Sequence, residues 1–571
     1  MKQPRLLFFI LLFAALIRLF LLNSFPTGIS NDELHFVLNA KSVFLQFTDL
    51  ARNGWNPLSL QTIPQEASSE LTFLLAAPFI GSLPLSLFWS KLFYVLISLT
   101  TIFLTYKIVL ILINPKIALI SAAVFALNPW SVYVSKTAFD APVALCFFLL
   151  FIYLTLILRG WKVLLSLFPA LIGFYSYIGT KVIFIPLVLI VSYFSFHFQK
   201  KSQILPYLVL VFGSLFIVIF YYLNIQKSSA LNRFSELISP NNPQILYQSQ
   251  TDKNLSLRSP FKPVFSSPVA VLFRQSFSKY LNNFSPDILF LTGDHTYMVS
   301  LWQHGYFYYL DVLFLLLGLI YLFWKQRPAF LLLTSLILIS PIPEAIRIDR
   351  IPAYAFHSVL QYPFLIILIS AGIYFTLNSI PKLKYPLLFA YTLLFLNFID
   401  IYFFRYPIFQ SEGFNFSRRL LSRYLSLEST KSPIISVLAK EPESLFRNYL
   451  FFNNLVTREN LNQISEIYQH SQKRQHFIWK NILITGNLAD INPQGVVISD
   501  IDITDPKYLS SDKFSIARLS DPGEIFNIYR GITCSSAKLD PFTHHLNFTD
   551  FNLEFLPENQ FCQKFIIKTF D

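Results

Sequence analysis

The sequence predicts a polytopic α-helical membrane protein that carries a polar C-terminal domain. Of its 571 residues, 54% are hydrophobic and only 13% are charged, whereas a soluble protein of this length needs a larger polar surface. Apolar stretches of roughly 20 residues, the length of a helix that crosses a bilayer, recur up to residue 404. The tail beyond that point is polar and mixed. The chain therefore divides into a helical membrane region, 1–404, and a smaller domain, 405–571.

The distribution of charge predicts the orientation in the membrane. A net charge of +13 could indicate nucleic acid as a partner, but the basic residues lie in short loops between the apolar stretches, as in cytoplasmic loops of membrane proteins. We therefore exclude nucleic acid. We expect about eleven spans in the cell membrane, a cytoplasmic N-terminus and an extracytoplasmic C-terminal domain. The predicted spans are 6–22, 85–113, 117–134, 139–158, 161–177, 182–198, 204–223, 306–324, 329–342, 351–375 and 385–404.

Two long loops, 23–84 and 224–305, fall on the outer side in this arrangement. The first contains an apolar piece, 71–83, that is short for a span. If it crossed the membrane, every later loop would change sides and the charge pattern would fail, so we interpret it as interfacial or re-entrant. The polar stretches around residues 32, 136–140 and 344–350 then share the outer face.

An acidic pair, Asp32 and Glu33, follows the first span within Ile29-Ser-Asn-Asp-Glu-Leu-His-Phe36. Carboxylates are costly beside hydrocarbon, so a pair held there indicates a function. The same residues could instead begin an interfacial helix, with Ser30 or Asn31 as N-cap and the acids in the first turn. The local sequence leaves both interpretations open.

The stretch Asp32-Glu-Leu-His-Phe36 resembles the Asp-Glu-x-His-Phe stretch in the first outer loop of protein O-mannosyltransferases. The order of spans and loops over residues 1–400 resembles the GT-C superfamily of membrane glycosyltransferases, which includes bacterial polyprenyl-phosphate-sugar transferases. Three later stretches are similar to outer segments of bacterial members: 128–140, 284–287 with Gly293-Asp-His295, and Pro343-Glu-Ala-Ile-Arg347. Related bacterial transferases often have Lys-Pro-Pro before the second span, where this chain has Gln65-Glu-Ala-Ser-Ser-Glu70, so the resemblance does not define the sugar or the acceptor.

The resemblance implies an enzyme that moves a sugar from a polyprenyl-phosphate donor to a hydroxyl of a protein, glycan or lipid acceptor at the outer surface, with inversion. Such a reaction needs a base for the hydroxyl and fixed cations for the leaving phosphate. A divalent metal stays open as a cofactor. The alternative is a non-catalytic transporter or flippase for lipid-linked sugars, which would more often carry charges in the middle of its spans; the sequence has almost none there. A membrane-anchored assembly protein is a third alternative.

We expect Asp32 to be the base and Glu33 to orient it. Asp140 is a second candidate acid, and equally a candidate N-cap of the fourth span. Arg347 and Arg350 are the expected phosphate ligands, because guanidinium groups bind phosphate oxygens in pairs; both could instead anchor the chain at the interface. The weaker candidates are Lys136 for the phosphate and, as support, His35, Asp294, His295 and His357, of which His35 is expected to be structural.

The tail has strand-like stretches at 433–438, 482–485 and 496–499 and a helix-like stretch at 446–454, which predicts a small α/β or α+β domain. It contains two of the three cysteines, Cys534 and Cys562. An exported tail lies in an oxidising compartment, where we expect these two to form a disulfide. The adjacent His544 and His545 are not expected to share a metal, because neighbouring residues on a strand face opposite ways.

Overall fold

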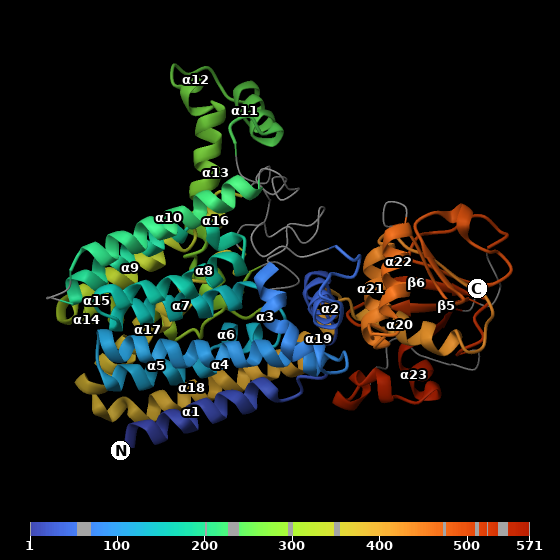
Figure 1. Cartoon of the computed structure of the whole chain (residues 1–571), viewed down its shortest axis with the longest axis horizontal. Helices are drawn as coiled ribbons and strands as arrows, with labels where there is room; N and C mark the ends of the chain where they lie inside the picture. Colours follow the sequence, from blue (N-terminus) through green and yellow to red (C-terminus); the bar gives the residue numbers. More distant parts are fainter. Residues whose placement is uncertain are drawn as a thin grey trace.

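The computed structural model describes residues 2–53, 70–199, 203–225, 239–294, 301–347, 354–471, 475–508, 513–521, 523–534 and 546–569. Its membrane region is a bundle of helices that run side by side, with the C-terminal domain at one end and the N-terminus at the other (Figure 1). The two ends of the chain thus lie at opposite ends of the bundle, as an odd number of spans requires.

Each of the eleven predicted spans contains a helix. Within the described residues, five helical stretches are long and apolar enough to cross a membrane: Leu87–Leu112, Leu205–Asn224, Arg327–Ala345, Gln361–Ser379 and Pro381–Phe409. The chain is therefore a polytopic helical membrane protein. The bundle helices are α1 (Lys2–Leu19), α4 (Leu87–Leu112), α5 (Pro115–Leu127), α7 (Ala141–Ile157), α8 (Leu167–Ser176), α9 (Phe184–Phe198), α10 (Leu205–Ile225), α14 (Asp311–Lys325), α15 (Arg327–Ile339), α17 (Gln361–Ser379) and α18 (Lys384–Asp400).

Two predicted spans differ from the observed helices at the ends that were predicted to face outward. The stretch 117–134 is divided into α5 and a short helix, α6 (Pro129–Val134). The break falls at Asn128, which precedes a proline and so is disfavoured in a helix; its side chain instead caps α6, accepting the Ser131 N–H at 3.0 Å. The stretch predicted from residue 351 becomes helical only at Gln361. The turns that precede α17 therefore belong to the outer end of the bundle.

The centre of the bundle contains a close approach of two helix backbones. A Cβ atom on Gly318 of α14 would lie 1.8 Å from the Leu368 carbonyl oxygen of α17, and one on Gly372 would lie 1.9 Å from the Phe314 carbonyl oxygen. Only residues without a Cβ allow this contact, in which each glycine faces the backbone of the other helix.

Shorter helices lie around the bundle, either toward the C-terminal domain or to its side (Figure 1). They are α2 (Asn31–Gln46), α3 (Glu70–Gly81), α11 (Pro243–Leu255), α12 (Lys262–Phe265), α13 (Pro268–Asn282), α16 (Ile342–Ala345) and α19 (Tyr406–Phe409). The apolar piece 71–83 corresponds to α3, a helix of 12 residues, and its interfacial or re-entrant position stays a prediction.

The C-terminal domain is built on a seven-stranded sheet with the strand order β2-β3-β1-β4-β6-β5-β7. β1 runs parallel to β3 and β4, and the remaining pairs are antiparallel. The elements are α20 (Phe416–Glu428), β1 (Ile435–Leu438), α21 (Pro442–Phe452), α22 (Leu461–His470), β2 (His476–Trp479), β3 (Ile482–Thr485), β4 (Val496–Ser499), β5 (Lys513–Ala517), β6 (Glu524–Tyr529), α23 (Glu558–Phe565) and β7 (Ile567–Thr569). The three stretches predicted as strands are β3, β1 and β4, which form the parallel part of the sheet.

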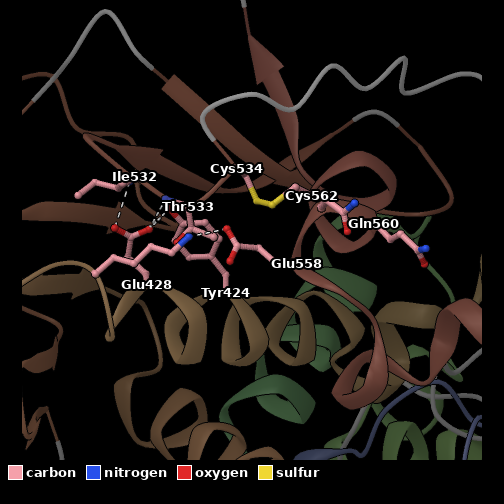
Figure 2. The surroundings of a disulfide bond; sticks show 10 residues. Tyr424, Glu428, Ile532, Thr533, Cys534, Glu558, Gln560 and Cys562 are labelled. Atoms are coloured by element: carbon pink, nitrogen blue, oxygen red, sulfur yellow. Dashed lines mark hydrogen bonds and ion pairs between the residues drawn. A yellow bond between two sulfur atoms is a disulfide. The ribbon is translucent and has the colours of Figure 1, made fainter.

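A disulfide between Cys534 and Cys562 joins the segment after β6 to α23 (Figure 2). Beside it, the Glu428 carboxylate at the end of α20 accepts the backbone N–H groups of Ile532 at 3.1 Å and Thr533 at 2.8 Å. Three elements of the tail are thus held together at one point. His544 and His545 lie outside the described residues.

Candidate functional site

The acidic motif forms the first turn of α2. The Ser30 side chain caps this helix by accepting the Glu33 N–H at 3.3 Å, and the Ser30 N–H donates to Glu33 Oε2 at 2.8 Å. This reciprocal pair is a capping box, which satisfies two backbone donors at the helix start. The interpretation of the motif as a helix start is therefore correct for Glu33.

Glu33 has a second structural role. Its Oε1 accepts the Ala138 N–H at 2.7 Å, and the side chain is fully buried. Burial raises its pKa, although the Lys91 charge and the N–H donors of Ser30 and Ala138 act in the opposite direction. Glu33 thus fixes the segment that leads to Asp140 against the start of α2.

The loop before α2 is held from two sides. Lys91 of α4 donates to the Gly28 carbonyl at 3.2 Å, and Arg419 of α20 donates to the Thr27 carbonyl at 2.6 Å. A Cβ on Gly28 would lie 2.0 Å from the Phe414 carbonyl oxygen, so the loop passes directly against the C-terminal domain. The same domain holds Asn31, whose side-chain oxygen accepts the Ser444 hydroxyl at 2.5 Å.

These contacts leave Asp32 exposed at the surface of the first turn. Its neighbours on either side, Asn31 and Glu33, are bound to other elements, so the backbone that carries Asp32 is fixed. An exposed carboxylate on a fixed helix start is accessible to a substrate.

Charged side chains from four segments act on Tyr354, which lies in the turns before α17. The charges of Asp32, Asp140 and Asp294 act on its hydroxyl together with that of Arg347; burial first, and then the three acids, raise the pKa of Tyr354, while Arg347 lowers it. The fold therefore places three acids and one arginine within electrostatic range of one tyrosine, although they are spread over more than 300 residues of the sequence.

Arg347 lies within a buried network. Its guanidinium contacts the His357 ring at 2.7 Å and 3.0 Å, and His357 Nδ1 contacts Glu344 Oε2 at 2.5 Å. The ring of Tyr177, which follows α8, stacks on His357 with centroids 6.1 Å apart. Glu344 and His357 thus orient the guanidinium of Arg347. Its charge acts on Tyr354 together with the charges of the three acids, Asp32, Asp140 and Asp294.

Asp140 occupies the N-cap position of α7 but makes no side-chain cap hydrogen bond. The capping interpretation of this residue therefore fails, and its carboxylate is one of those that act on Tyr354. Asp294 is buried close to the Tyr306 hydroxyl. His35 contacts Asn39 one turn along α2, with 3.2 Å between Nδ1 and Nδ2, as expected for a structural residue.

Lys136, a weaker candidate for the donor phosphate, lies in enclosed surroundings, and its role at the phosphate stays a prediction. Lys136 is fully buried and donates to the Phe20 carbonyl, with its ammonium 4.8 Å from the ring centre of Phe403. Burial, and then the charges of Lys91 and Arg18, hold its pKa well below the usual range. An enclosed amine of this kind fixes the end of the first span. Arg350 and His295 lie outside the described residues.

Sequence reasoning gave no role to Glu344, Tyr354 or Lys91. Glu344 lies in the quoted stretch before Arg347, and Lys91 is a cation within a predicted span, which is itself an indication of a special environment. Nothing in the surrounding sequence singles out Tyr354, which is one of 29 tyrosines. In the part of the chain that the structure describes, no group of three or more His, Cys, Asp or Glu side chains could hold a metal ion.

Comparisons with known proteins give matches among solved structures alone. No family model matches the sequence, and no curated protein matches it. ArnT from Cupriavidus metallidurans in the apo state has a TM-score of 0.47 at 10% identity, with 91% of this chain and 97% of that chain covered. The archaeal oligosaccharyltransferase AglB from Archaeoglobus fulgidus, in complex with an inhibitory peptide and a dolichol-phosphate, has a TM-score of 0.40 at 10% identity, with 92% and 74% covered.

ArnT bound to undecaprenyl phosphate is also similar, with a TM-score of 0.43 at 11% identity and the same coverage as the apo form. ArnT and AglB belong to the GT-C superfamily that the sequence resemblance names. A likeness with TM-scores below 0.5 does not by itself assign this chain to that superfamily.

Proposed function

We propose that this protein is an integral membrane glycosyltransferase that moves a sugar from a polyprenyl-phosphate donor to an acceptor hydroxyl on the outer side of the membrane. The proposal is supported by the charges of Asp32, Asp140, Asp294 and Arg347, which all act on Tyr354. It is further supported by the hydrogen bonds that hold Arg347 against His357, and His357 against Glu344. Acids that can accept a proton and a cation that can bind a phosphate thus lie within electrostatic range of one tyrosine.

Asp32 is the general base in this mechanism. Its carboxylate takes the proton of the acceptor hydroxyl while the hydroxyl oxygen attacks the anomeric carbon. The bond between that carbon and the phosphate oxygen breaks, and the leaving phosphate takes the electron pair. A single displacement of this kind inverts the anomeric configuration.

Arg347 stabilises the negative charge that develops on the leaving phosphate. Its guanidinium can donate two parallel hydrogen bonds to phosphate oxygens. The contacts with His357 and Glu344 hold it in place before the donor arrives, which lowers the cost of reorganisation during the reaction.

The position of the site suits a lipid-linked donor. Asp32 follows α1 by a short loop, and Arg347 follows α15 and α16 directly. Both residues therefore lie near the ends of membrane helices, where a polyprenyl tail can remain in the bilayer while its phosphate and sugar reach the site.

The test is transfer of a labelled sugar from polyprenyl phosphate in membranes that contain the purified protein. We expect labelled acceptor from the wild-type chain and only background from the Asp32→Asn chain. Movement of the labelled lipid across the membrane without transfer would contradict the proposal and favour the flippase alternative.

A further inference from the structure

The helices α11, α12 and α13 form an arm, residues 243–282, that stands off from the side of the bundle. In Figure 1, α13 runs across the direction of the bundle helices and lies at the level of α16. If the bundle helices cross the membrane, α13 lies roughly along the membrane surface.

The arm has one continuous exposed apolar stripe. Val269, Phe273, Phe277 and Leu281 of α13 recur at intervals of four residues, which places neighbours on the same helix face. Their exposed fractions range from 49% to 65%. The rings of Phe273 and Phe277 stack with centroids 5.7 Å apart, so the stripe is ordered although no described part of the chain covers it.

The charge of the arm is strongly one-sided. It contains five basic residues and a single acidic one, Asp252, which pairs with Arg274. The basic residues are Lys253, Arg258, Lys262, Arg274 and Lys279. A helix that combines an apolar face with an excess of Lys and Arg is the kind that lies in the interface of an anionic membrane.

The root of the arm is fixed at the end of the membrane helices. The Tyr280 hydroxyl donates to the Leu338 carbonyl of α15 at 2.8 Å, and Lys279 donates to the Arg347 carbonyl at 3.1 Å. Leu331 and Leu338 of α15 are themselves exposed. The stripe therefore continues an apolar surface that already belongs to the membrane region.

We propose that the arm is an interfacial anchor, with the apolar stripe among the acyl chains of the outer leaflet and the basic residues among anionic phospholipid headgroups. Burial of the stripe in lipid removes its apolar side chains from water. The excess positive charge adds attraction to an anionic surface. Both contributions arise from this segment alone and do not depend on the catalytic proposal.

The test uses single labelled cysteines in the full chain in lipid nanodiscs. The native cysteines do not interfere, because Cys146 is buried and the other two form the disulfide. An environment-sensitive fluorophore is attached at Phe273→Cys and, in a second variant, at Phe277→Cys. Two exposed positions serve as controls: Gln275→Cys, which lies on the opposite side of α13, and Ile478→Cys in the C-terminal domain.

We expect the emission of labels at positions 273 and 277 to be blue-shifted. Lipids with a nitroxide on the acyl chain should quench most of this emission. The labels at 275 and 478 should instead be quenched by aqueous iodide. Iodide quenching at 273 and 277 as strong as at 478 would overturn the proposal. Protection from both quenchers would also overturn it, because it would mean that protein, such as a second copy of the chain, covers the stripe.

The contribution of charge is tested by lipid composition. Replacing part of the phosphatidylcholine by phosphatidylglycerol should increase the nitroxide quenching at position 273. In a chain that also carries Arg258→Glu and Lys262→Glu, this increase should disappear. An equal response of the two chains would contradict the role of anionic headgroups. Elution profile and melting temperature establish that each labelled variant is folded.

Discussion

At the scale of single residues, the two adjacent acids of the motif have different environments. Asp32 is exposed, whereas Glu33 is buried and accepts backbone N–H groups with both oxygens. Substitution of Asp32 should therefore affect catalysis, and substitution of Glu33 should affect stability. A variant of either residue can therefore serve as the control for a variant of the other.

Asp32→Asn should lower the rate of sugar transfer by a factor on the order of 10²–10⁴, the usual effect of losing a general base. The substitution keeps the size of the side chain, and Asn is tolerated at a helix start as well as Asp, so the melting temperature should not change. The transfer rate is measured at matched expression. Nearly normal turnover would remove Asp32 as the base.

Glu33→Gln should lower the stability by about 1–3 kcal/mol, the cost of leaving a buried donor unsatisfied. An amide presents one oxygen and one NH₂ group, so either the Ser30 N–H or the Ala138 N–H would face another donor. Thermal unfolding in detergent measures the effect, with Asp32→Asn as the control. An unchanged melting temperature together with a large loss of transfer would instead assign Glu33 to the chemistry.

Arg347→Ala should raise the KM for the donor and lower kcat, because the leaving phosphate loses its cation. Arg347→Lys should restore activity only in part, since lysine keeps the charge but cannot form the paired hydrogen bonds. Steady-state kinetics with varied donor concentration test this. If both variants had wild-type donor kinetics, Arg347 would have no role at the phosphate.

At the scale of elements, the C-terminal domain is held together where α20 meets the segment of the disulfide. Burial disfavours the charged form of Glu428, but hydrogen bonds from Ser432, Thr533 and Ile532 outweigh it and lower the pKa of this carboxyl below its usual value. The ionised carboxylate therefore stabilises the contact between α20 and residues 532–533 (Figure 2).

A lowered pKa has a defined consequence for stability. The contribution of Glu428 is present at neutral pH and is lost as the pH falls through the folded-state pKa, below the ordinary value of 4.5, because the unfolded chain then binds the proton more readily. The measurement is the difference in melting temperature between wild type and Glu428→Gln as a function of pH. We expect the difference to be largest near pH 7 and to shrink in acid; a constant difference would contradict the assignment.

At the scale of the whole molecule, the N-terminus and the C-terminal domain lie at opposite ends of the bundle (Figure 1). Together with the basic loops, this predicts that the loop between α14 and α15 is cytoplasmic and that the sheet domain is outside. Single cysteines at Lys325 and Phe555 are suitable probes because both residues are exposed. In intact cells, an impermeant thiol reagent should label position 555 and leave position 325 unlabelled until the membrane is opened. The opposite result would invert the topology.

The sequence by itself determined the class of the protein and the order of its parts. Apolar stretches of membrane length predict helices whatever they pack against, because in lipid the backbone must satisfy its own hydrogen bonds. For the same reason, the bundle helices and the short apolar helix α3 could be predicted from local sequence. The strands β1, β3 and β4 could also be predicted from the sequence, because buried parallel strands appear there as short apolar runs.

Only the tertiary structure decided what the polar residues do. Asp32 and Glu33 are adjacent and chemically alike, and their difference arises because the Ala138 N–H and Lys91, distant in the sequence, meet one side of α2. The enclosure of Lys136 against Phe20 and the action of three acidic charges on Tyr354 likewise come from packing. Charges and hydrogen bonds act through space over a few ångströms, so their partners are set by packing and cannot be read from the order of residues.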